Sequence, residues 1–156
     1  MNTVQETLAE VVEQTLEDFA FMFVEDLPQQ APEPAEEEGL YRADISFESP
    51  EGQGTLAVIA GGEFCDALAR NVLGLEFGEV MLEGAAENAL CEFLNVVCGS
   101  VVAELYGSEA VVHLSIPESG VCDKAEWELI TGSEQALNVI VEGSSLVLVL
   151  ETQERT

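Results

Sequence analysis

The residues in this sequence best suited to chemistry are an acid and an amide one helical turn apart, Glu92 and Asn95. Residues at positions i and i+3 project from the same face of a helix, so these two side chains stand side by side. A carboxylate accepts hydrogen bonds and attracts cations, while a carboxamide both donates and accepts hydrogen bonds without being ionised. The pair is therefore suited to holding groups that another molecule brings to it.

Gly99 lies four residues after Asn95 and falls on the same polar face. A glycine inside a helix costs roughly 1 kcal/mol compared with alanine, but it leaves space in which another surface can approach. Asn88, one turn before Glu92, is a candidate to widen this docking face, although a plain surface role is the simpler interpretation. The opposite face is an apolar stripe that we expect to be buried, formed by Leu90, Cys91, Leu94, Val97, Cys98, Val101 and Leu105. This pattern suits a helix that enters the active site of another protein.

A helix of this kind has to be held in place, and the hydrophobic pattern predicts the elements around it. These are a helix over 4–24, strands over 40–48 and 53–60, a short helix over 63–73, the long helix over 80–106, and strands over 110–116, 136–141 and 146–151. Residues 126–130 form either a short strand or a bend. This order predicts an α+β fold in which helices cover one face of an antiparallel sheet.

The length of 156 residues predicts a single domain over 1–156. Its expected parts are an N-terminal helix within 1–27, an acidic, proline-rich connector over 28–39 that is exposed and flexible, and an α+β core over 40–151. Leu27 precedes a proline, which disfavours helix at the residue before it, so the first helix is expected to end there at the latest.

The charge is strongly negative, with 31 acidic residues against 4 basic ones and a formal net charge of −27. Such a surface is a poor partner for nucleic acids and for anionic membranes. Two explanations of the charge stay open. Solubility, or a host with generally acidic proteins, is the simpler one, and attraction to a basic patch on a partner is the functional one.

The same sequence indicates a cytoplasmic protein. No uncharged apolar run approaches the roughly 18 residues that a membrane span needs, and the first ten residues do not resemble a signal peptide. The four cysteines show neither a CxxC pair nor metal-ligand spacing, so we expect buried free thiols. His113 is alone in an alternating segment, and a structural role is a simpler interpretation than a general base.

The segment Glu92-x-x-Asn95-x-x-x-Gly99 in a long helix resembles the signature of the CheC/CheX/FliY family of chemotaxis phosphatases. The hairpin over 42–60 and the helix end Asn71-Val72-Leu73-Gly74 precede it in the same order, and the resemblance covers roughly residues 40–150. CheC-type members carry two such motifs. This chain has one, because Glu134-Gln-Ala-Leu-Asn138 has the wrong spacing, so it is similar to the single-motif CheX-type proteins.

The resemblance implies a phosphatase that hydrolyses the phospho-aspartate of a CheY-like response regulator. In this role Asn95 positions the attacking water and Glu92 docks the regulator's active-site lysine. The phosphatase needs no cofactor of its own, since the regulator supplies Mg²⁺. The resemblance also implies a homodimer joined through its sheets, which the apolar strands expected over 110–116, 136–141 and 146–151 favour. The alternative is a non-catalytic binding module that docks a receiver domain or another signalling partner.

Overall fold

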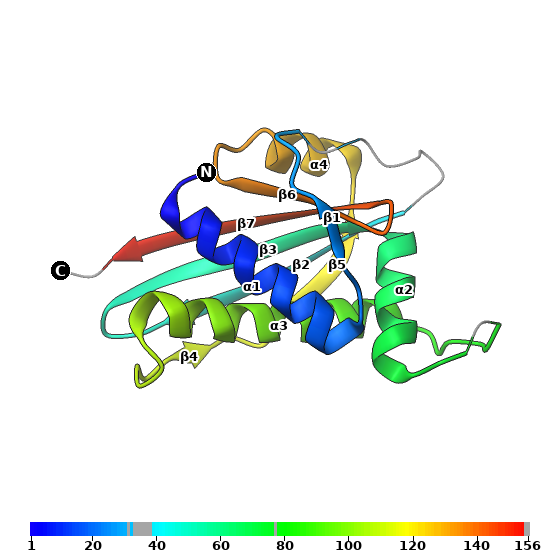
Figure 1. Ribbon diagram of the computed structural model, residues 1–156, viewed down its shortest axis with the longest axis horizontal. Helices are drawn as coiled ribbons and strands as arrows, with labels where there is room; N and C mark the ends of the chain where they lie inside the picture. The colour runs from blue at the N-terminus through cyan, green and yellow to red at the C-terminus, as the bar shows by residue number, and fades with distance from the viewer. Residues whose placement is uncertain (31, 33–38, 77, 155–156) are drawn as a thin grey trace.

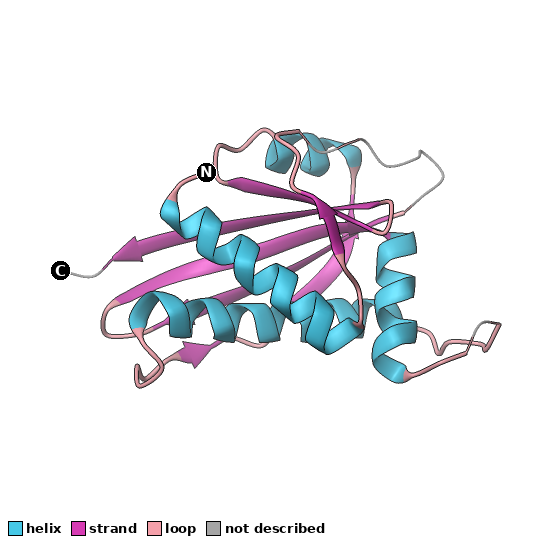
Figure 2. Ribbon diagram, viewed as in Figure 1, coloured by secondary structure: helices cyan, strands magenta, loops and turns pink. Residues whose placement is uncertain are grey.

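The computed structural model describes residues 1–30, 32, 39–76 and 78–154, which form one antiparallel sheet of seven strands and four helices (Figures 1 and 2). The helices are α1 (Thr3–Ala20), α2 (Gly62–Leu73), α3 (Ala85–Tyr106) and α4 (Lys124–Thr131). The strands are β1 (Val24–Asp26), β2 (Leu40–Glu48), β3 (Gly52–Gly61), β4 (His113–Leu114), β5 (Glu118–Cys122), β6 (Ala136–Val141) and β7 (Ser144–Glu154). The strand order is β1-β6-β7-β3-β2-β4, and β5 also pairs with β2.

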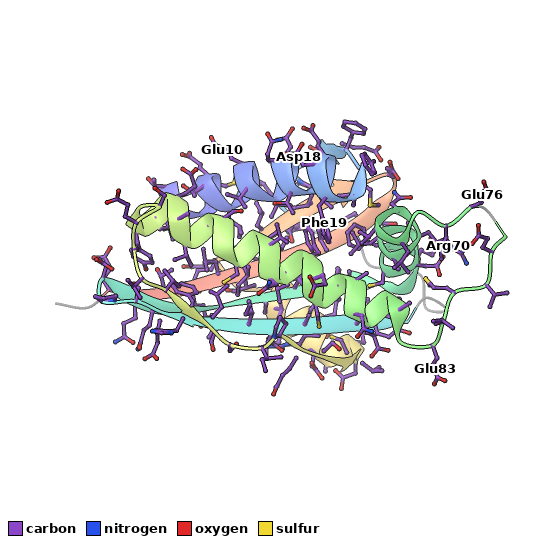
Figure 3. The ribbon with its side chains drawn as sticks, turned by 90° about the horizontal axis from the view of Figure 1, so that it is seen from below. Glu10, Asp18, Phe19, Arg70, Glu76 and Glu83 are labelled. Atoms are coloured by element: carbon purple, nitrogen blue, oxygen red, sulfur yellow. The ribbon has the colours of Figure 1, made fainter. Side chains whose placement is uncertain are left out.

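Two cores lie on the two faces of this sheet. The main core holds the inward side chains of β3 and β7, such as Val58 and Leu148, against α1, α2 and α3 (Figure 3). Ile59 and Val147 point the other way, because successive residues of a strand alternate faces, and they pack with Trp127 of α4. The expected α+β fold with an antiparallel sheet under helices is confirmed. The short helix α4 adds cover on the second face.

Two aromatic contacts hold the helix α3, one in its first half and one at its last residue. Phe93 packs edge-on against Phe64 of α2, with 6.4 Å between ring centroids. Tyr106, the last residue of α3, lies 6.2 Å from the ring of Phe47 in β2. Gly52 makes room for it, since a Cβ there would come within 2.6 Å of the Tyr106 hydroxyl. These contacts determine where the rest of α3 lies on the sheet.

The first helix is shorter than expected, ending at Ala20 instead of near residue 24. Phe21 adopts a left-handed conformation, with φ of 56°, and the N–H of Met22 donates to the carbonyl of Leu16 at 2.9 Å. The N–H of Phe21 is also directed at the carbonyl of Leu16, and a residue in the left-handed conformation is a common way for a helix to end. The chain then turns into β1, which pairs with β6. Glycine is the usual residue at such a position, so the sequence carried no signal for this helix end.

The long helix α3 begins at Ala85, five residues later than expected. Gly84 precedes it with φ of 82°, a left-handed conformation that ends the preceding segment. Val80 and Leu82, which the periodicity placed in the helix, are 92% and 84% exposed. They belong to the segment that connects α2 to α3.

Two further elements differ from the expectation between residues 110 and 131. The strand predicted over 110–116 is only the two-residue β4, and the segment over 126–130 lies in a helix, α4. Asp123 caps α4, since its side chain accepts a hydrogen bond from the N–H of Glu126. Burial of Trp127, which is 2% exposed, holds this short helix on the sheet.

The connector predicted over 28–39 falls largely on residues 31 and 33–38, which lie outside the described residues. Its described ends contact the second face of the sheet. Asn138 donates to the carbonyl of Gln29 at 2.9 Å, and the hydroxyl of Ser145 donates to the carbonyl of Pro32 at 3.2 Å.

Within the described residues, α3 is long and apolar enough to cross a membrane by length and composition alone, contrary to the expectation from the sequence. The core helix of a globular domain passes the same test. The apolar side of α3 lies against the sheet, with Leu90, Phe93, Leu94 and Val97 fully buried.

Phe93→Ala should lower the free energy of unfolding by about 3–5 kcal/mol, the usual loss for a buried phenylalanine. The matched control is Val96→Ala on the same helix, where the side chain is 37% exposed. That change should stay within about 0.5 kcal/mol. Urea denaturation measures both. Similar losses at the two positions would contradict the assignment of the buried face.

Candidate functional site

The predicted docking residues share the side of α3 that faces away from the core. Asn88 and Glu92 are exposed, and Asn95 and Gly99 are half-buried. Their spacing of four, three and four residues keeps them in one row along the helix. The opposite side of the helix is buried, through Ala89, Leu90, Phe93, Leu94, Val97, Cys98, Val101 and Val102. Five of the seven residues predicted for the buried stripe are buried, whereas Cys91 and Leu105 are half-buried. The prediction left out Phe93, which is fully buried.

Glu92 and Asn95 have no competing partners of their own. In the part of the chain that the structure describes, neither side chain makes a hydrogen bond or an ion pair, in contrast to Asp66 and Asn71 of the neighbouring α2. A carboxylate and a carboxamide together offer several donor and acceptor positions. All of these remain available to an incoming molecule.

Gly99 faces open space. A Cβ built at this position would meet no atom within 4 Å, so packing inside the described chain does not require a glycine here. The usual cost of a glycine within a helix is therefore not offset by any contact that the structure shows. The bare stretch of backbone lies one turn beyond Asn95, on the exposed row.

A groove of about 540 Å³ opens directly beside Glu92. Its walls are the end of α2, the segment before α3 and the first turns of α3. The residues that line it are Val72, Leu73, Leu75, Val80, Leu82, Glu83, Ala85, Asn88, Ala89 and Glu92. The sequence did not predict this groove, because Val80 and Leu82 fall within the expected long helix, whereas α3 begins only at Ala85. Gly78 and Gly84, both with positive φ, were the available signal.

Arg70 ties the outer wall of this groove to α2. Its Nε donates to the carboxylate of Asp66 at 2.9 Å, and its Nη1 donates to the backbone carbonyl of Glu79 at 2.7 Å. Figure 3 shows Arg70 reaching from α2 toward the segment that carries Glu76 and Glu83. One guanidinium therefore connects a helix to the chain segment on the other side of the groove.

The cysteines do not provide a nucleophile at this site. None of the four forms a disulfide, as expected, and all but the half-buried Cys91 are buried. Burial raises the pKa of Cys98 to about 12 and that of Cys122 to about 11, so both stay protonated at neutral pH. Cys98 also lies on the core side of α3, away from Glu92.

The other groups of the site suggest no second centre. Within the described residues, no three side chains of His, Cys, Asp or Glu come together as a metal site. His113 lies on β4, opposite Glu48 of β2 in the ladder. The residues that the structure brings together are those on the exposed row of α3 and those that line the adjacent groove.

Neither the models of protein families nor the curated proteins contain a match to this chain. Solved structures match almost all of it. CheX from Desulfovibrio desulfuricans superposes with a TM-score of 0.70 at 11% identity, over 97% of this chain and 100% of that one. A CheC-like superfamily protein from Shewanella sp. PV-4 gives 0.66 at 14% identity, over 98% and 99%.

A third structure is the complex of CheX with CheY, BeF3 and Mg²⁺ from Borrelia burgdorferi. It gives a TM-score of 0.65 at 12% identity, over 96% of this chain and 97% of that one. At these identities the likeness is one of fold, and it extends over nearly the full length of each protein. The chain therefore has the fold of the CheX and CheC-like chemotaxis proteins, which confirms the resemblance that its motif predicted.

Proposed function

We propose that this chain hydrolyses the phospho-aspartate of a CheY-like response regulator. The observation that carries the proposal is the pair Glu92 and Asn95, which stands without internal partners on the exposed side of a firmly packed helix. The fold supports it, because a neighbour with the same fold was solved in complex with CheY, BeF3 and Mg²⁺. Response regulators act in the cytoplasm, which is where we place this chain.

The role assigned to Asn95 is to position a water molecule. In a phosphorylated receiver the Mg²⁺ ion neutralises charge on the acyl phosphate, and the carboxylate is a good leaving group, so positioning is the main task left to a catalyst. The amide oxygen of Asn95 accepts one water hydrogen and directs the oxygen lone pair at phosphorus. The new P–O bond forms as the bond to the aspartate breaks. Both water hydrogens end on dihydrogen phosphate, so no separate proton acceptor is required.

The role assigned to Glu92 is to fix the docking register. Its carboxylate forms a salt bridge with the active-site lysine of the receiver, one helical turn away from the water on Asn95. Gly99 allows the receiver surface to come close to the backbone of α3, and Asn88 extends the contact in the other direction. The phosphatase then supplies neither a metal nor a covalent intermediate, since Mg²⁺ arrives with the regulator.

Asn95→Ala should abolish the stimulated dephosphorylation and leave receiver binding nearly unchanged, because the amide acts on the water alone. Glu92→Ala should weaken binding and rate together, because its lysine partner is present before and during the reaction. Both side chains lie outside the core, so the free energy of unfolding should change by about 0.5 kcal/mol or less. Decay of the phosphorylated receiver, at equal concentrations of each variant, measures the effect.

Substoichiometric wild-type protein is the control in this experiment. A catalyst shortens the lifetime of many receivers per molecule, whereas a non-catalytic binding module changes it only in proportion to the complex formed. If Asn95→Ala retained full activity, the proposal that Asn95 positions the water would be wrong. If the wild type binds but never turns over, the binding module becomes the better account of the chain.

Gly99→Ala should separate stability from activity. The alanine should raise the free energy of unfolding by up to about 1 kcal/mol, since it is the better helix former and its Cβ meets nothing. The same methyl group should raise the KM for the phosphorylated receiver, because it occupies the space between the two proteins. Thermal denaturation and steady-state kinetics test the two halves. Ser100→Ala, at the exposed next position, is the control. Unchanged KM in Gly99→Ala would remove Gly99 from the docking face.

We also propose that the chain forms a twofold homodimer through the β5 edge of its sheet. The apolar strands β6 and β7 cannot serve, because each lies between two other strands. In the described part of the chain, β5 pairs with β2 alone, and Val121 on it is 79% exposed. An uncovered edge strand is a template for pairing with a second chain, and two such edges can extend one sheet across a twofold axis.

Light scattering should therefore show a dimer at tens of micromolar, an order of magnitude that suits a stable interface. Val121→Lys should shift the protein to monomer, because a lysine on an edge strand opposes pairing. Leu129→Lys, at an equally exposed position on α4, should not. A wild-type monomer at this concentration would refute the dimer.

A further inference from the structure

We propose that the groove beside Glu92 is a second docking point of the response regulator, and that it takes an apolar patch of the receiver surface flanked by basic side chains. This inference rests on the proposed function and extends it. It assigns a role to residues on the segment between α2 and α3, none of which belongs to the acid–amide motif.

The groove is continuous with the acid–amide motif. Asn88 and Glu92 line the groove and also stand in the exposed row of α3. A receiver whose lysine reaches Glu92 has to lie over the mouth of the groove, because the two share that side chain. The groove is therefore part of any interface that uses Glu92.

Large apolar side chains are exposed around the groove. Leu73, Val80 and Leu82 are 56%, 92% and 84% exposed, and all three line the groove. Single exposed apolar residues are common, but a group of them around one groove is typical of a surface that another protein covers. When a partner covers these side chains and removes them from water, the free energy of binding becomes more favourable.

The groove is held in shape before a partner arrives. Arg70 connects Asp66 of α2 to the backbone of Glu79, so the outer wall is tied to the helix that forms the inner end. Since binding to a preformed surface avoids the cost of ordering a loop, Arg70 acts as a positioning residue for this docking point.

The charge around the groove defines the chemistry of the occupant. Glu76, Glu79, Glu83 and Glu92 lie on or beside its walls. The nearby cation, Arg70, is already engaged by the carboxylate of Asp66. An apolar centre with an acidic rim is complementary to an apolar patch with lysine or arginine around it. The occupant that fits is therefore a receiver surface of this kind, next to the lysine that meets Glu92 in the proposed function.

The test is the steady-state kinetics of phosphate release from receiver domains of the same organism, with acetyl phosphate as the phosphoryl donor. The double variant Val80→Ser/Leu82→Ser should raise KM by about tenfold with kcat unchanged, because the lost contacts act in binding and not on the water. Both residues are exposed, so the fold should persist. Leu129→Ser removes an equally exposed leucine from α4, on the other face of the sheet, and should behave as wild type.

Arg70→Met tests the wall itself. The change keeps much of the side-chain volume but removes both hydrogen bonds. The outer wall of the groove then has to be ordered when the receiver binds, so KM should rise by roughly a few-fold. The value of kcat should again be unchanged. A fall in kcat alone would contradict a positioning role. Binding of the receiver loaded with BeF3 and Mg²⁺, measured by calorimetry, gives a readout that does not depend on turnover.

The outcomes separate this inference from the proposed function. If the wild type is active and KM is unchanged in the double variant, the docking role of the groove is refuted and the proposed phosphatase activity is not. A wild type that binds the loaded receiver without turnover, and loses affinity in the double variant, supports the groove and overturns catalysis. A wild type that neither binds nor dephosphorylates any receiver overturns both.

Discussion

The structure depends on the burial of one side of α3 between the sheet and the helices α1 and α2. Eight residues of this helix are buried, from Ala89 to Val102, and they form the centre of the main core. The same burial fixes the rotation of the helix about its axis, because an apolar face this wide has one orientation that removes it from water. The row from Asn88 to Gly99 is set by that orientation, since within the described residues the side chains of Asn88, Glu92 and Asn95 make no hydrogen bond that could hold them.

A site of this kind needs stiffness more than chemical reactivity. In the proposed reaction the partner supplies the metal, the phosphoryl group and the leaving group, and α3 supplies two side chains at a fixed separation. The rate of the proposed reaction would depend more on the position of these two side chains, to within a fraction of an ångström, than on their reactivity. The aromatic contacts of Phe93, in the first half of the helix, and of Tyr106, at its end, suit this demand.

The sequence predicted the parts of the fold that follow from alternation and periodicity. The strands β2 and β6 have the expected bounds. In β2 the alternation of apolar and polar residues matches alternating burial, and β6 is a short, mostly apolar run that ends before the turn at Gly143. The two faces of α3 were also predictable, and with them the row that carries Glu92 and Asn95. These features depend on local spacing alone.

The parts that the sequence did not predict depend on tertiary contacts. Phe21 takes a conformation that glycine usually takes, and it ends α1 where the periodicity alone would have continued. Helix α4 has only eight residues, so its stability comes from the burial of Trp127 against β3 and β7, which no local pattern reports. The groove beside Glu92 was hidden for a similar reason, since apolar Val80 and Leu82 resemble buried helical positions although they are exposed.

The pairing of the arginines has a consequence for the speed of encounter. Arg42 forms ion pairs with Asp44 and Glu126, and Arg70 forms one with Asp66. Two of the four basic residues are therefore already paired with carboxylates, and the protein with its net charge of −27 presents little positive charge to a partner. A field of one sign accelerates association with an oppositely charged partner and is screened by dissolved ions. With a partner that is basic at its docking surface, the time before the two proteins meet would lengthen as ionic strength rises, while the lifetime of an already formed complex would change much less. The duration of the signal would then follow the ionic conditions of the cell.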